Sequence, residues 1–178
     1  MYKIVTAPNE ILNKQLKPVP VVDKRIKQIV KEMTETLRNL DNPKGVGLAA
    51  NQVGIDLAIF VFRQKKRIRP IINPKLISHS EQDVLDVRGK STMLEGCLSI
   101  PKYYGTVKRY DEITIEYLLL DGTIAIETFK MPEAVIIQHE MDHLNGRLFV
   151  EKLLSQKGIL YKVEKGKKGK DELVEIEI

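Results

Sequence analysis

A short segment in the C-terminal third of the chain carries two histidines four residues apart, with a glutamate directly after the first. His139, Glu140 and His143 form this His-Glu-x-x-His run. Residues four apart lie about one turn apart on an α-helix, so both imidazoles project from one face and can share one cation. The chain has only three histidines, which makes chance spacing a weak explanation. The segment is therefore predicted to form a helix that bears a metal site.

Local signals mark the limits of this helix and of a second one. Pro132 occupies a first-turn position that proline favours, and Gly146 stands where a C-terminal cap belongs, so the helix is expected from about residue 133 to residue 145. Residues 22–40 are predicted to form an amphipathic helix with Asp23 as its N-cap. Its apolar face repeats every 3.6 residues and consists of Ile26, Ile29, Val30, Met33, Leu37 and Leu40.

The middle of the chain is rich in β-branched and aromatic residues, which favour strands. Asp121-Gly122 is a strong hairpin-turn signal, whereas the glycine-containing segment 45–47 is not expected to be an ordinary strand. The expected fold class is α+β, with antiparallel β-sheets packed around a central helix that bears the His-Glu-x-x-His run. Strands are predicted over 55–62, 71–77, 107–110, 113–120 and 123–130.

Length and composition favour a single catalytic domain over residues 1–178. A chain of 178 residues is long enough to bury a hydrophobic core. Its one cysteine excludes an intrachain disulfide and suits a reducing compartment. We find no signal-peptide pattern and no apolar run long enough to span a bilayer. We therefore expect a cytoplasmic protein with no membrane partner.

The formal net charge of +5 is unevenly spread. Basic residues gather at 63–69 and in a Gly/Lys-rich tail segment at about 157–170, followed by a candidate terminal strand over 172–178. We interpret the basic runs as solvated loops and a flexible tail. The alternative is weak attraction to a polyanion such as RNA or a ribosome surface. Neither run interleaves aromatic side chains, so no specific reading of nucleic acid is expected.

Two helical histidines leave a catalytic metal site one protein ligand short. One protease pattern continues His-Glu-x-x-His with a third histidine, and this sequence follows that pattern as far as Gly146 but has Phe149 in the ligand position. Glu151 and Glu164 lie downstream, but nothing around them marks either as a ligand. Cys97 taken alone would be interpreted as a small buried side chain. Beside an incomplete metal site it becomes the favoured third ligand.

Three motifs carry a resemblance to a known family. Gly45–Gln52 (GVGLAANQ), Glu95–Ser99 (EGCLS) and Gln138–Gly146 (QHEMDHLNG) are similar, in this order, to the signature motifs of the peptide deformylases. A looser resemblance extends from the Ile4–Pro8 stretch to about Leu153. The resemblance implies a metallo-amidohydrolase of a bacterial or bacterial-like compartment. Such an enzyme hydrolyses the N-terminal formyl group of N-formylmethionyl nascent polypeptides and releases formate.

The resemblance also implies a metal centre. Cys97, His139 and His143 would hold one divalent ion, with water in the fourth position. The cation would lower the pKa of that water, and Glu140 would take the proton and return it to the leaving amine. Two imidazoles and a thiolate suit several ions. The resemblance favours Fe²⁺ as the native ion, with Zn²⁺, Ni²⁺ or Co²⁺ as alternatives.

Oxyanion donors and a substrate wall are implied in the same way. The side-chain amide of Gln52 and the backbone N–H of Leu98 would stabilise the tetrahedral oxyanion. Without the resemblance, Gln52 would be interpreted as a surface amide and Leu98 as core packing. An extended peptide would form main-chain bonds along Gly45, Val46 and Gly47, where the glycines allow close approach.

A pocket for the first side chain of the substrate, methionine in this family, can be placed on the helix. Val135 and Ile136 lie four and three residues before His139, so they project from a similar face. Core packing explains them equally well, since pocket linings are themselves apolar. The sequence departs from the family near Tyr104, where some members carry an arginine that contacts the substrate backbone. Its tail also lacks a long terminal helix, so no ribosome contact of such a helix transfers, and only a transient ribosome association is considered.

Two alternative functions make different predictions. A His-Glu-x-x-His metalloprotease would cleave internal peptide bonds and would be indifferent to Cys97→Ser, and the absent downstream ligand argues against it. A binding protein with a structural metal would need a fourth protein ligand. The chain has no second cysteine, and His79 lies in a polar loop. That ligand would therefore have to be a carboxylate.

Overall fold

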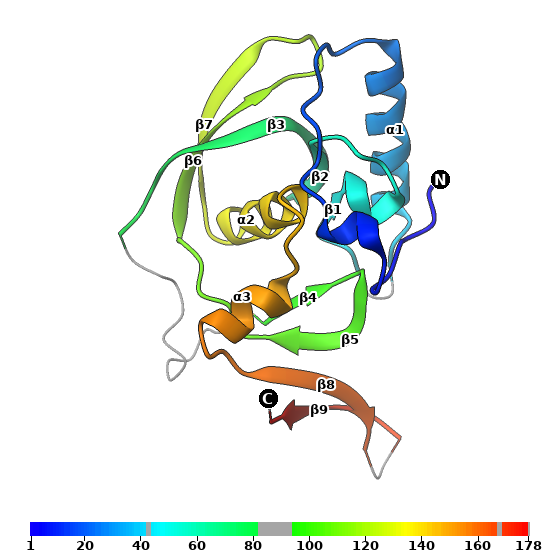
Figure 1. Ribbon diagram of the computed structural model, residues 1–178, viewed down its shortest axis with the longest axis vertical. Helices are drawn as coiled ribbons and strands as arrows, with labels where there is room; N and C mark the ends of the chain where they lie inside the picture. Colours follow the sequence, from blue (N-terminus) through cyan, green and yellow to red (C-terminus); the bar gives the residue numbers. More distant parts are fainter. Residues whose placement is uncertain (42–43, 82–93, 167–168, 178) are drawn as a thin grey trace.

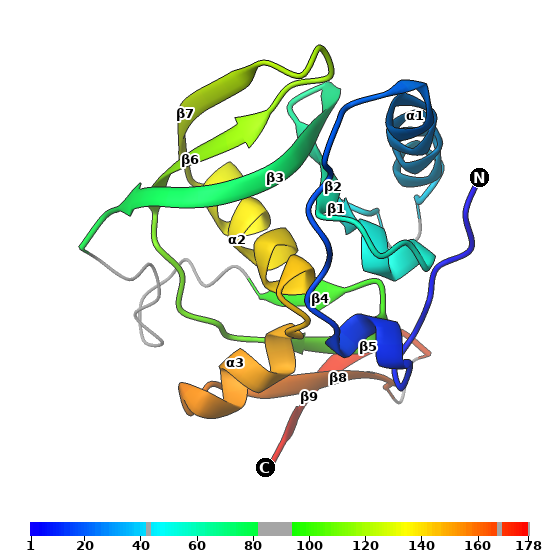
Figure 2. The same cartoon turned by 45° about the horizontal axis from the view of Figure 1, so that its top comes forward.

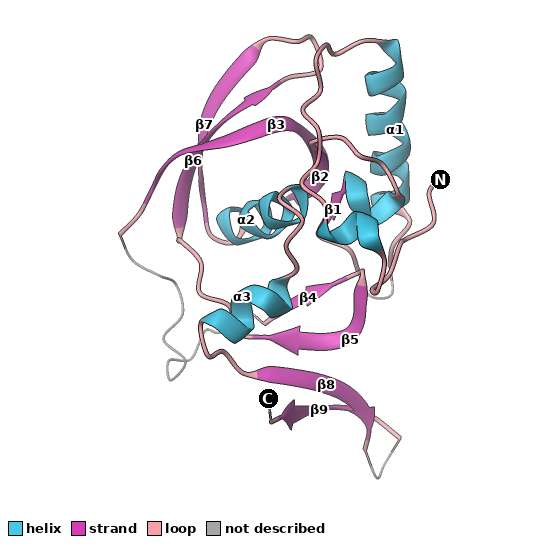
Figure 3. Cartoon of the chain, viewed as in Figure 1, coloured by secondary structure: helices cyan, strands magenta, loops and turns pink. Residues whose placement is uncertain are grey.

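The computed structural model describes residues 1–41, 44–81, 94–166 and 169–177. Within these ranges the chain forms two antiparallel sheets and three α-helices (Figure 1, Figure 3). The expected α+β class is confirmed. In chain order the elements are η1 (Glu10–Asn13), α1 (Lys24–Arg38), β1 (Gly47–Ala49), η2 (Ala50–Val53), β2 (Ile59–Gln64), β3 (Arg67–His79), β4 (Glu95–Cys97), β5 (Ile100–Gly105), β6 (Glu112–Leu118), β7 (Ile124–Lys130), α2 (Glu133–Leu144), α3 (Phe149–Ser155), β8 (Leu160–Lys165) and β9 (Asp171–Ile176).

The two sheets lie on different sides of α2. The five-stranded sheet has the order β1-β2-β3-β6-β7, and the four-stranded sheet has the order β4-β5-β8-β9. Figure 1 and Figure 2 both show α2 enclosed by the curved five-stranded sheet, with β4 and β5 on its other side. The main core lies where α1 and α2 pack against β1, β2 and β3 and includes Met33, Leu48 and Phe60. The helix with the His-Glu-x-x-His run is therefore central.

Helix α1 forms where the apolar period predicts it. The carboxylate of Asp23 caps the helix by accepting a hydrogen bond from the N–H of Ile26 at 2.9 Å. The apolar stripe, which includes Met33 and Leu37, is buried. None of the helices in the described residues has the length and apolar content required to cross a bilayer.

The ends of α2 follow from two local constraints. Pro132 is the N-cap residue, so its missing N–H costs the helix no hydrogen bond. At the other end Gly146 has a φ of +67°, and a Cβ there would stand 2.6 Å from the backbone of Asn13. Only glycine meets both the left-handed conformation and this close approach. The N-terminal segment is tied to the same helix end, since the N–H of Leu16 donates to the carbonyl of Leu144 at 2.8 Å.

Several strand predictions need correction. The hairpin of β6 and β7 turns at Gly122, which has a φ of +86°, as predicted. Residues 107–110 do not form a strand, since residues 107–109 have no strand pairing and Tyr110 forms only a single bridge. The segment 45–47 was not expected to be an ordinary strand, yet β1 begins at Gly47 and pairs with β2. Strand β2 begins only at Ile59, and β4, β5 and α3 are additional elements.

The tail is more ordered than the basic run suggests. Lys162 and Lys165 lie in β8, which extends the four-stranded sheet by pairing with β5, so a flexible tail is the wrong interpretation for this part. Strand β9 lies where the candidate terminal strand is placed, and it pairs with β8. Lys165 forms an ion pair of 2.7 Å with Asp171 across the hairpin. Residues 167–168 and 178 of the tail lie outside the described residues.

Candidate active site

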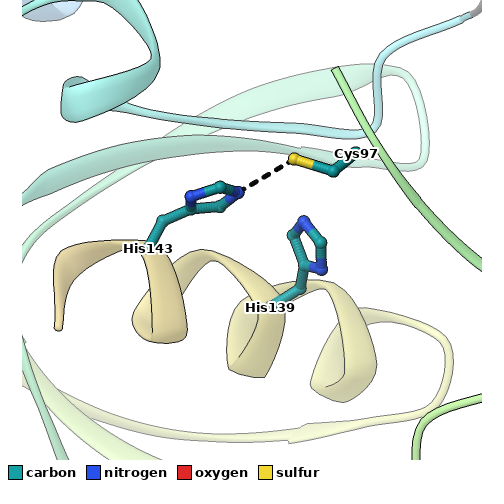
Figure 4. Close-up of side chains that lie close together, drawn as sticks. All are labelled: Cys97, His139 and His143. Atoms are coloured by element: carbon teal, nitrogen blue, oxygen red, sulfur yellow. Dashed lines mark hydrogen bonds between the residues drawn. The ribbon is translucent and has the colours of Figure 1, made fainter. Parts of the chain in front are cut away.

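Three potential metal ligands converge between α2 and β4. His139 and His143 stand one turn apart on α2, and Cys97 ends β4 (Figure 4). The Nε2 atom of His143 lies 3.1 Å from the Sγ atom of Cys97. One ligand atom from each of the three residues lies within 4.8 Å of the others. The structure thus brings together the cysteine and both histidines that the sequence singles out.

Strand alternation explains how Cys97 reaches the helix. Side chains two residues apart on a strand project from the same face, so Glu95 and Cys97 both point toward α2. Both side chains are buried. The chain then turns at Leu98 and Ser99, and the carbonyl of Ser99 accepts a hydrogen bond of 2.9 Å from the N–H of Ala7. The N-terminal segment therefore helps to hold this turn in place.

The donor set fits a divalent transition metal. The Nδ1 atom of His139 lies 2.9 Å from a carboxylate oxygen of Glu95, which leaves Nε2 of this ring for the cluster. A carboxylate on the outer nitrogen is the usual partner of a metal-bound histidine. Two imidazoles and one thiolate are typical ligands of zinc, iron, cobalt and nickel.

Electrostatics in the cluster favour a thiolate. Burial raises the pKa of the Cys97 thiol, but the adjacent His143 and His139 outweigh burial and leave that pKa well below its ordinary value. Burial lowers the pKa of His139, while its hydrogen bonds to Cys97 and Glu95 raise it well above the ordinary value. The cysteine is thus held in the charged form in which sulfur binds metal.

Glu140 lies beside the cluster in a confined, apolar setting. Its side chain is buried, and its Oε2 atom has no hydrogen-bond partner among the described residues. Burial raises the pKa of Glu140 to about 7, against the lowering effect of His139 and His143. A carboxyl group with a pKa near neutrality can both accept and return a proton. The glutamate therefore has the properties of a general base and acid.

Gln52 is buried beside Cys97 and is not a surface amide. Its Oε1 atom accepts a hydrogen bond of 2.9 Å from the N–H of Ala49. Its Nε2 atom donates toward Cys97 Sγ at 3.4 Å and to the hydroxyl of Ser99 at 3.2 Å. This arrangement fixes the amide orientation, with its N–H₂ group directed at the cluster. Leu98 follows Cys97 in the turn after β4 and is partly buried against the main core.

The segment Gly45–Gly47 forms a wall next to Glu140. Val46 is 50% exposed, and its carbonyl accepts a hydrogen bond of 2.7 Å from the N–H of Arg63. The Arg63 guanidinium also donates to the carbonyl of Gly45 at 2.7 Å, which fixes the segment from the side of β2. A Cβ on Gly47 would collide with the Glu140 carboxylate.

The two helical residues proposed for the pocket differ in their surroundings. Val135 is 6% exposed and belongs to neither hydrophobic cluster of the described residues. Ile136 is partly buried and packs against the main core. Val135 is therefore buried outside those clusters, whereas Ile136 packs against the main core.

A buried charge network behind the cluster was missed from the sequence. Arg109 is 2% exposed and donates two hydrogen bonds to Glu95, at 2.7 and 2.9 Å. It also donates to Asp142, which lies on α2 between the two histidines. Burial raises the pKa of Glu95, but Arg109 and His139 outweigh it and lower that pKa to about 2. No local signal distinguishes Arg109, which follows Lys108 and precedes Tyr110, Asp111 and Glu112.

The downstream carboxylates are used elsewhere. Glu151 accepts a hydrogen bond of 3.2 Å from the N–H of Leu148 at the start of α3. Glu164 lies in β8 and pairs with Lys162 at 2.8 Å. Neither carboxylate belongs to the Cys97, His139 and His143 group found among the described residues.

The fold and the site together define a class of protein. A Cys-His-His cluster beside a buried glutamate, with a fixed amide donor, is the arrangement of a metal-dependent hydrolase. The family model for polypeptide deformylase matches residues 1–158. The chain belongs to the peptide deformylase family, whose members remove the formyl group from nascent polypeptides.

Individual relatives agree with this assignment. Peptide deformylase 1 of Burkholderia multivorans is 40% identical over 174 residues, which cover 93% of this chain and 88% of the relative. Peptide deformylase of Borreliella burgdorferi is 40% identical over 175 residues, covering 94% of this chain and 99% of the relative. The crystal structure of peptide deformylase from Thermotoga maritima is similar to this chain with a TM-score of 0.77 and 32% sequence identity. The match covers 85% of this chain and 97% of the Thermotoga maritima chain.

Proposed function

We propose that this chain hydrolyses the formyl group of N-formylmethionyl peptides at the cluster formed by Cys97, His139 and His143. These three residues would hold one divalent ion and leave one position open. The bound ion supplies Lewis acidity and lowers the pKa of a water molecule. The observation that carries the proposal is the convergence of the three ligand atoms within 4.8 Å, beside a buried glutamate.

Glu140 is proposed as the residue that moves the proton. Its pKa of about 7, raised by burial, allows its carboxylate to accept a proton from the attacking water near neutral pH. The same carboxyl group then returns the proton to the leaving amine. The Glu140 side chain lies against Gly47, so the substrate-binding wall and the proton acceptor are adjacent.

Gln52 and Leu98 are proposed as the oxyanion donors. The Gln52 amide is already oriented by Ala49 and directs its N–H₂ group toward Cys97. The backbone N–H of Leu98 lies next to the same ligand in sequence. Fixed donors at the developing oxyanion stabilise the transition state because they need no reorganisation during the reaction.

The peptide substrate is proposed to lie along Gly45, Val46 and Gly47. The carbonyl of Val46 is engaged with Arg63, so the N–H groups of Val46 and Gly47 are the groups proposed to bind the substrate backbone. Val135 and Ile136 are proposed to line the pocket for the methionine side chain, with Val135 the better supported of the two. Pockets of this kind are apolar with few polar groups.

Fe²⁺ is proposed as the native ion, with Zn²⁺, Ni²⁺ or Co²⁺ able to replace it. A thiolate ligand beside ferrous iron is open to oxidation. The iron form is therefore expected to lose activity in air while a zinc form keeps its activity. Equal activity of pure iron and pure zinc forms after aerobic storage would count against this choice.

A cytoplasmic location and a transient association with ribosomes are also proposed. In β8, Lys162 and Lys165 are paired with Glu164 and Asp171, so the basic residues at the β2–β3 turn are the proposed contact. Because β8 pairs with β5, deletion of the tail would disturb the sheet. Charge reversal at the exposed β2–β3 turn, Lys65→Glu with Lys66→Glu, is the cleaner test, and unchanged pelleting with ribosomes would remove this turn as the contact.

The direct test is release of formate from formyl-Met-Ala-Ser. Metal-loaded wild type should release formate, and Glu140→Gln should retain the metal but release formate at least about 100-fold more slowly. A metalloprotease would instead cleave internal peptide bonds. No formate from the metal-loaded wild type would overturn the proposal.

A further inference from the structure

Asn51 connects the turn that carries Gln52 to the helix that carries the histidines. Its side chain is fully buried, with 0% of its surface exposed. Its Nδ2 atom donates a hydrogen bond of 2.8 Å to the main-chain carbonyl of His143, 92 residues away in sequence. Burying an amide is costly unless it is hydrogen bonded. The position therefore carries a specific contact as well as filling space.

The carbonyl that Asn51 binds lies at the C-terminal end of α2. Carbonyls in the last turn of a helix have no partner within the helix. The His143 carbonyl receives the N–H of Gly146 at 3.1 Å and the amide of Asn51. The contact thus holds the helix at the residue whose ring directs Nε2 toward Cys97.

The same two side chains each hold one more buried polar atom. The Oδ1 atom of Asn51 and the Nδ1 atom of His143 are both buried and have no hydrogen-bond partner among the described residues. With Nε2 in the cluster, Nδ1 carries the ring proton and is a donor, whereas Oδ1 is an acceptor. A metal-bound histidine usually donates its outer N–H to an acceptor, as His139 does to Glu95. A buried water molecule is able to bridge such a pair.

We propose that Asn51 is a positioning residue for the metal centre, which fixes the end of α2 and the ring orientation of His143. The proposal rests on the metal role proposed for Cys97, His139 and His143. The proposal adds that η2 positions the metal ligand His143, through Asn51, as well as the oxyanion donor Gln52. Asn51 and Gln52 are neighbours in η2, so one short turn fixes both.

The test measures how fast Co²⁺-loaded protein loses its metal to excess EDTA, followed by the absorption of the bound ion. Asn51→Leu keeps the branched shape of the side chain, is larger, and removes both polar atoms. The His143 carbonyl still accepts the N–H of Gly146, so it is not left without a partner, but some loss of stability is expected from the added volume. We expect Asn51→Leu to release Co²⁺ at least about tenfold faster than wild type, as for other residues that orient metal ligands.

Asn145→Ala is the matched control. Asn145 donates its side-chain amide to the Met141 carbonyl at 2.8 Å, at the same end of α2, but this side chain is exposed and has no hydrogen bond to Cys97, His139 or His143 among the described residues. This variant is expected to release Co²⁺ within about twofold of wild type, as no ligand is touched. Asn51→Ala serves as the second variant if Asn51→Leu fails to fold.

Comparison with the metal-free proteins separates positioning from loss of fold. The free energy of unfolding of each metal-free variant is measured by urea, and the gain on Co²⁺ loading should be smaller only for Asn51→Leu or Asn51→Ala. Wild-type release rates in both Asn51 variants, or equal acceleration in Asn145→Ala, would overturn the proposal. No substrate is used, so a wild type without deformylase activity would overturn the proposed function and not this result.

Discussion

The carboxylate of Glu140 occupies the space into which a side chain at Gly47 would extend. A Cβ placed on Gly47 would lie within 3.0 Å of three atoms of the Glu140 side chain. Glu140 is 3% exposed and has little room to move away. The glycine therefore sets the position of the proposed proton acceptor.

Gly47→Ala should consequently impair the reaction more than the fold. The methyl group would displace the Glu140 carboxylate, and kcat should fall at least about 100-fold, which is the contribution of a well-placed acid–base group. Bound Co²⁺ should stay near one ion per chain, because the three ligands are not touched. Steady-state formate release and metal analysis on the same preparation check this expectation.

Gly54→Ala provides the control for Gly47→Ala. Gly54 has a φ of +80°, and no atom lies within 4 Å of the position that a methyl group there would take. Alanine there strains the backbone and should lower the free energy of unfolding by about 1 kcal/mol. Activity per metal-loaded molecule should be unchanged. Equal kcat for Gly47→Ala and wild type would contradict the steric explanation.

Cys97→Ser should weaken metal binding and abolish formate release. A serine hydroxyl replaces a soft thiolate, which is the ligand that favours zinc, iron and cobalt. Equilibrium dialysis against Co²⁺ measures the loss of affinity, and the bound ion should lack absorption from a thiolate bond. A Cys97→Ser protein with wild-type metal content and activity would favour the metalloprotease alternative.

Arg109→Met should destabilise the protein strongly. It removes the guanidinium that pairs with the buried carboxylate of Glu95 and with the partly buried Asp142, and breaking a buried ion pair costs about 3–5 kcal/mol. Urea unfolding measures the effect. Arg69→Met is the matched control, because Arg69 also binds a glutamate, Glu127, at 2.7 Å, with the two side chains 27% and 36% exposed. The control should lose only about 1 kcal/mol.

The helix α2 and its histidines could be predicted because their signals are local. Spacing of four residues, a proline at the start and Gly146 at the end all act within one helix. Cys97 lies far away in sequence, and the residues alone favoured it as third ligand only by elimination of the downstream candidates. The position of Cys97 on β4 depends on the pairing of β4 with β5, and no local sequence pattern predicts that pairing.

The rest of the site could not be predicted because it depends on contacts between distant segments. Arg109 lies in a short segment, 107–110, that was predicted to be a strand, and only the fold shows that Glu95 and Asp142 bind it. Asn51 reaches His143 across 92 residues. The lysines of β8 suggested a loop because charge runs usually lie in loops. The segment instead forms a strand, with Leu160 and Tyr161 paired to β5 and Val163 paired to β9.

The most direct measurement is a metal titration of the metal-free wild type under anaerobic conditions, with formate release from formyl-Met-Ala-Ser as the readout. Activity should rise with added Fe²⁺ or Co²⁺ and stop rising at one ion per chain. Glu140→Gln should bind the same single ion and stay inactive. Formate release without metal, or wild-type release by Glu140→Gln at full loading, would contradict the proposed metal-dependent reaction.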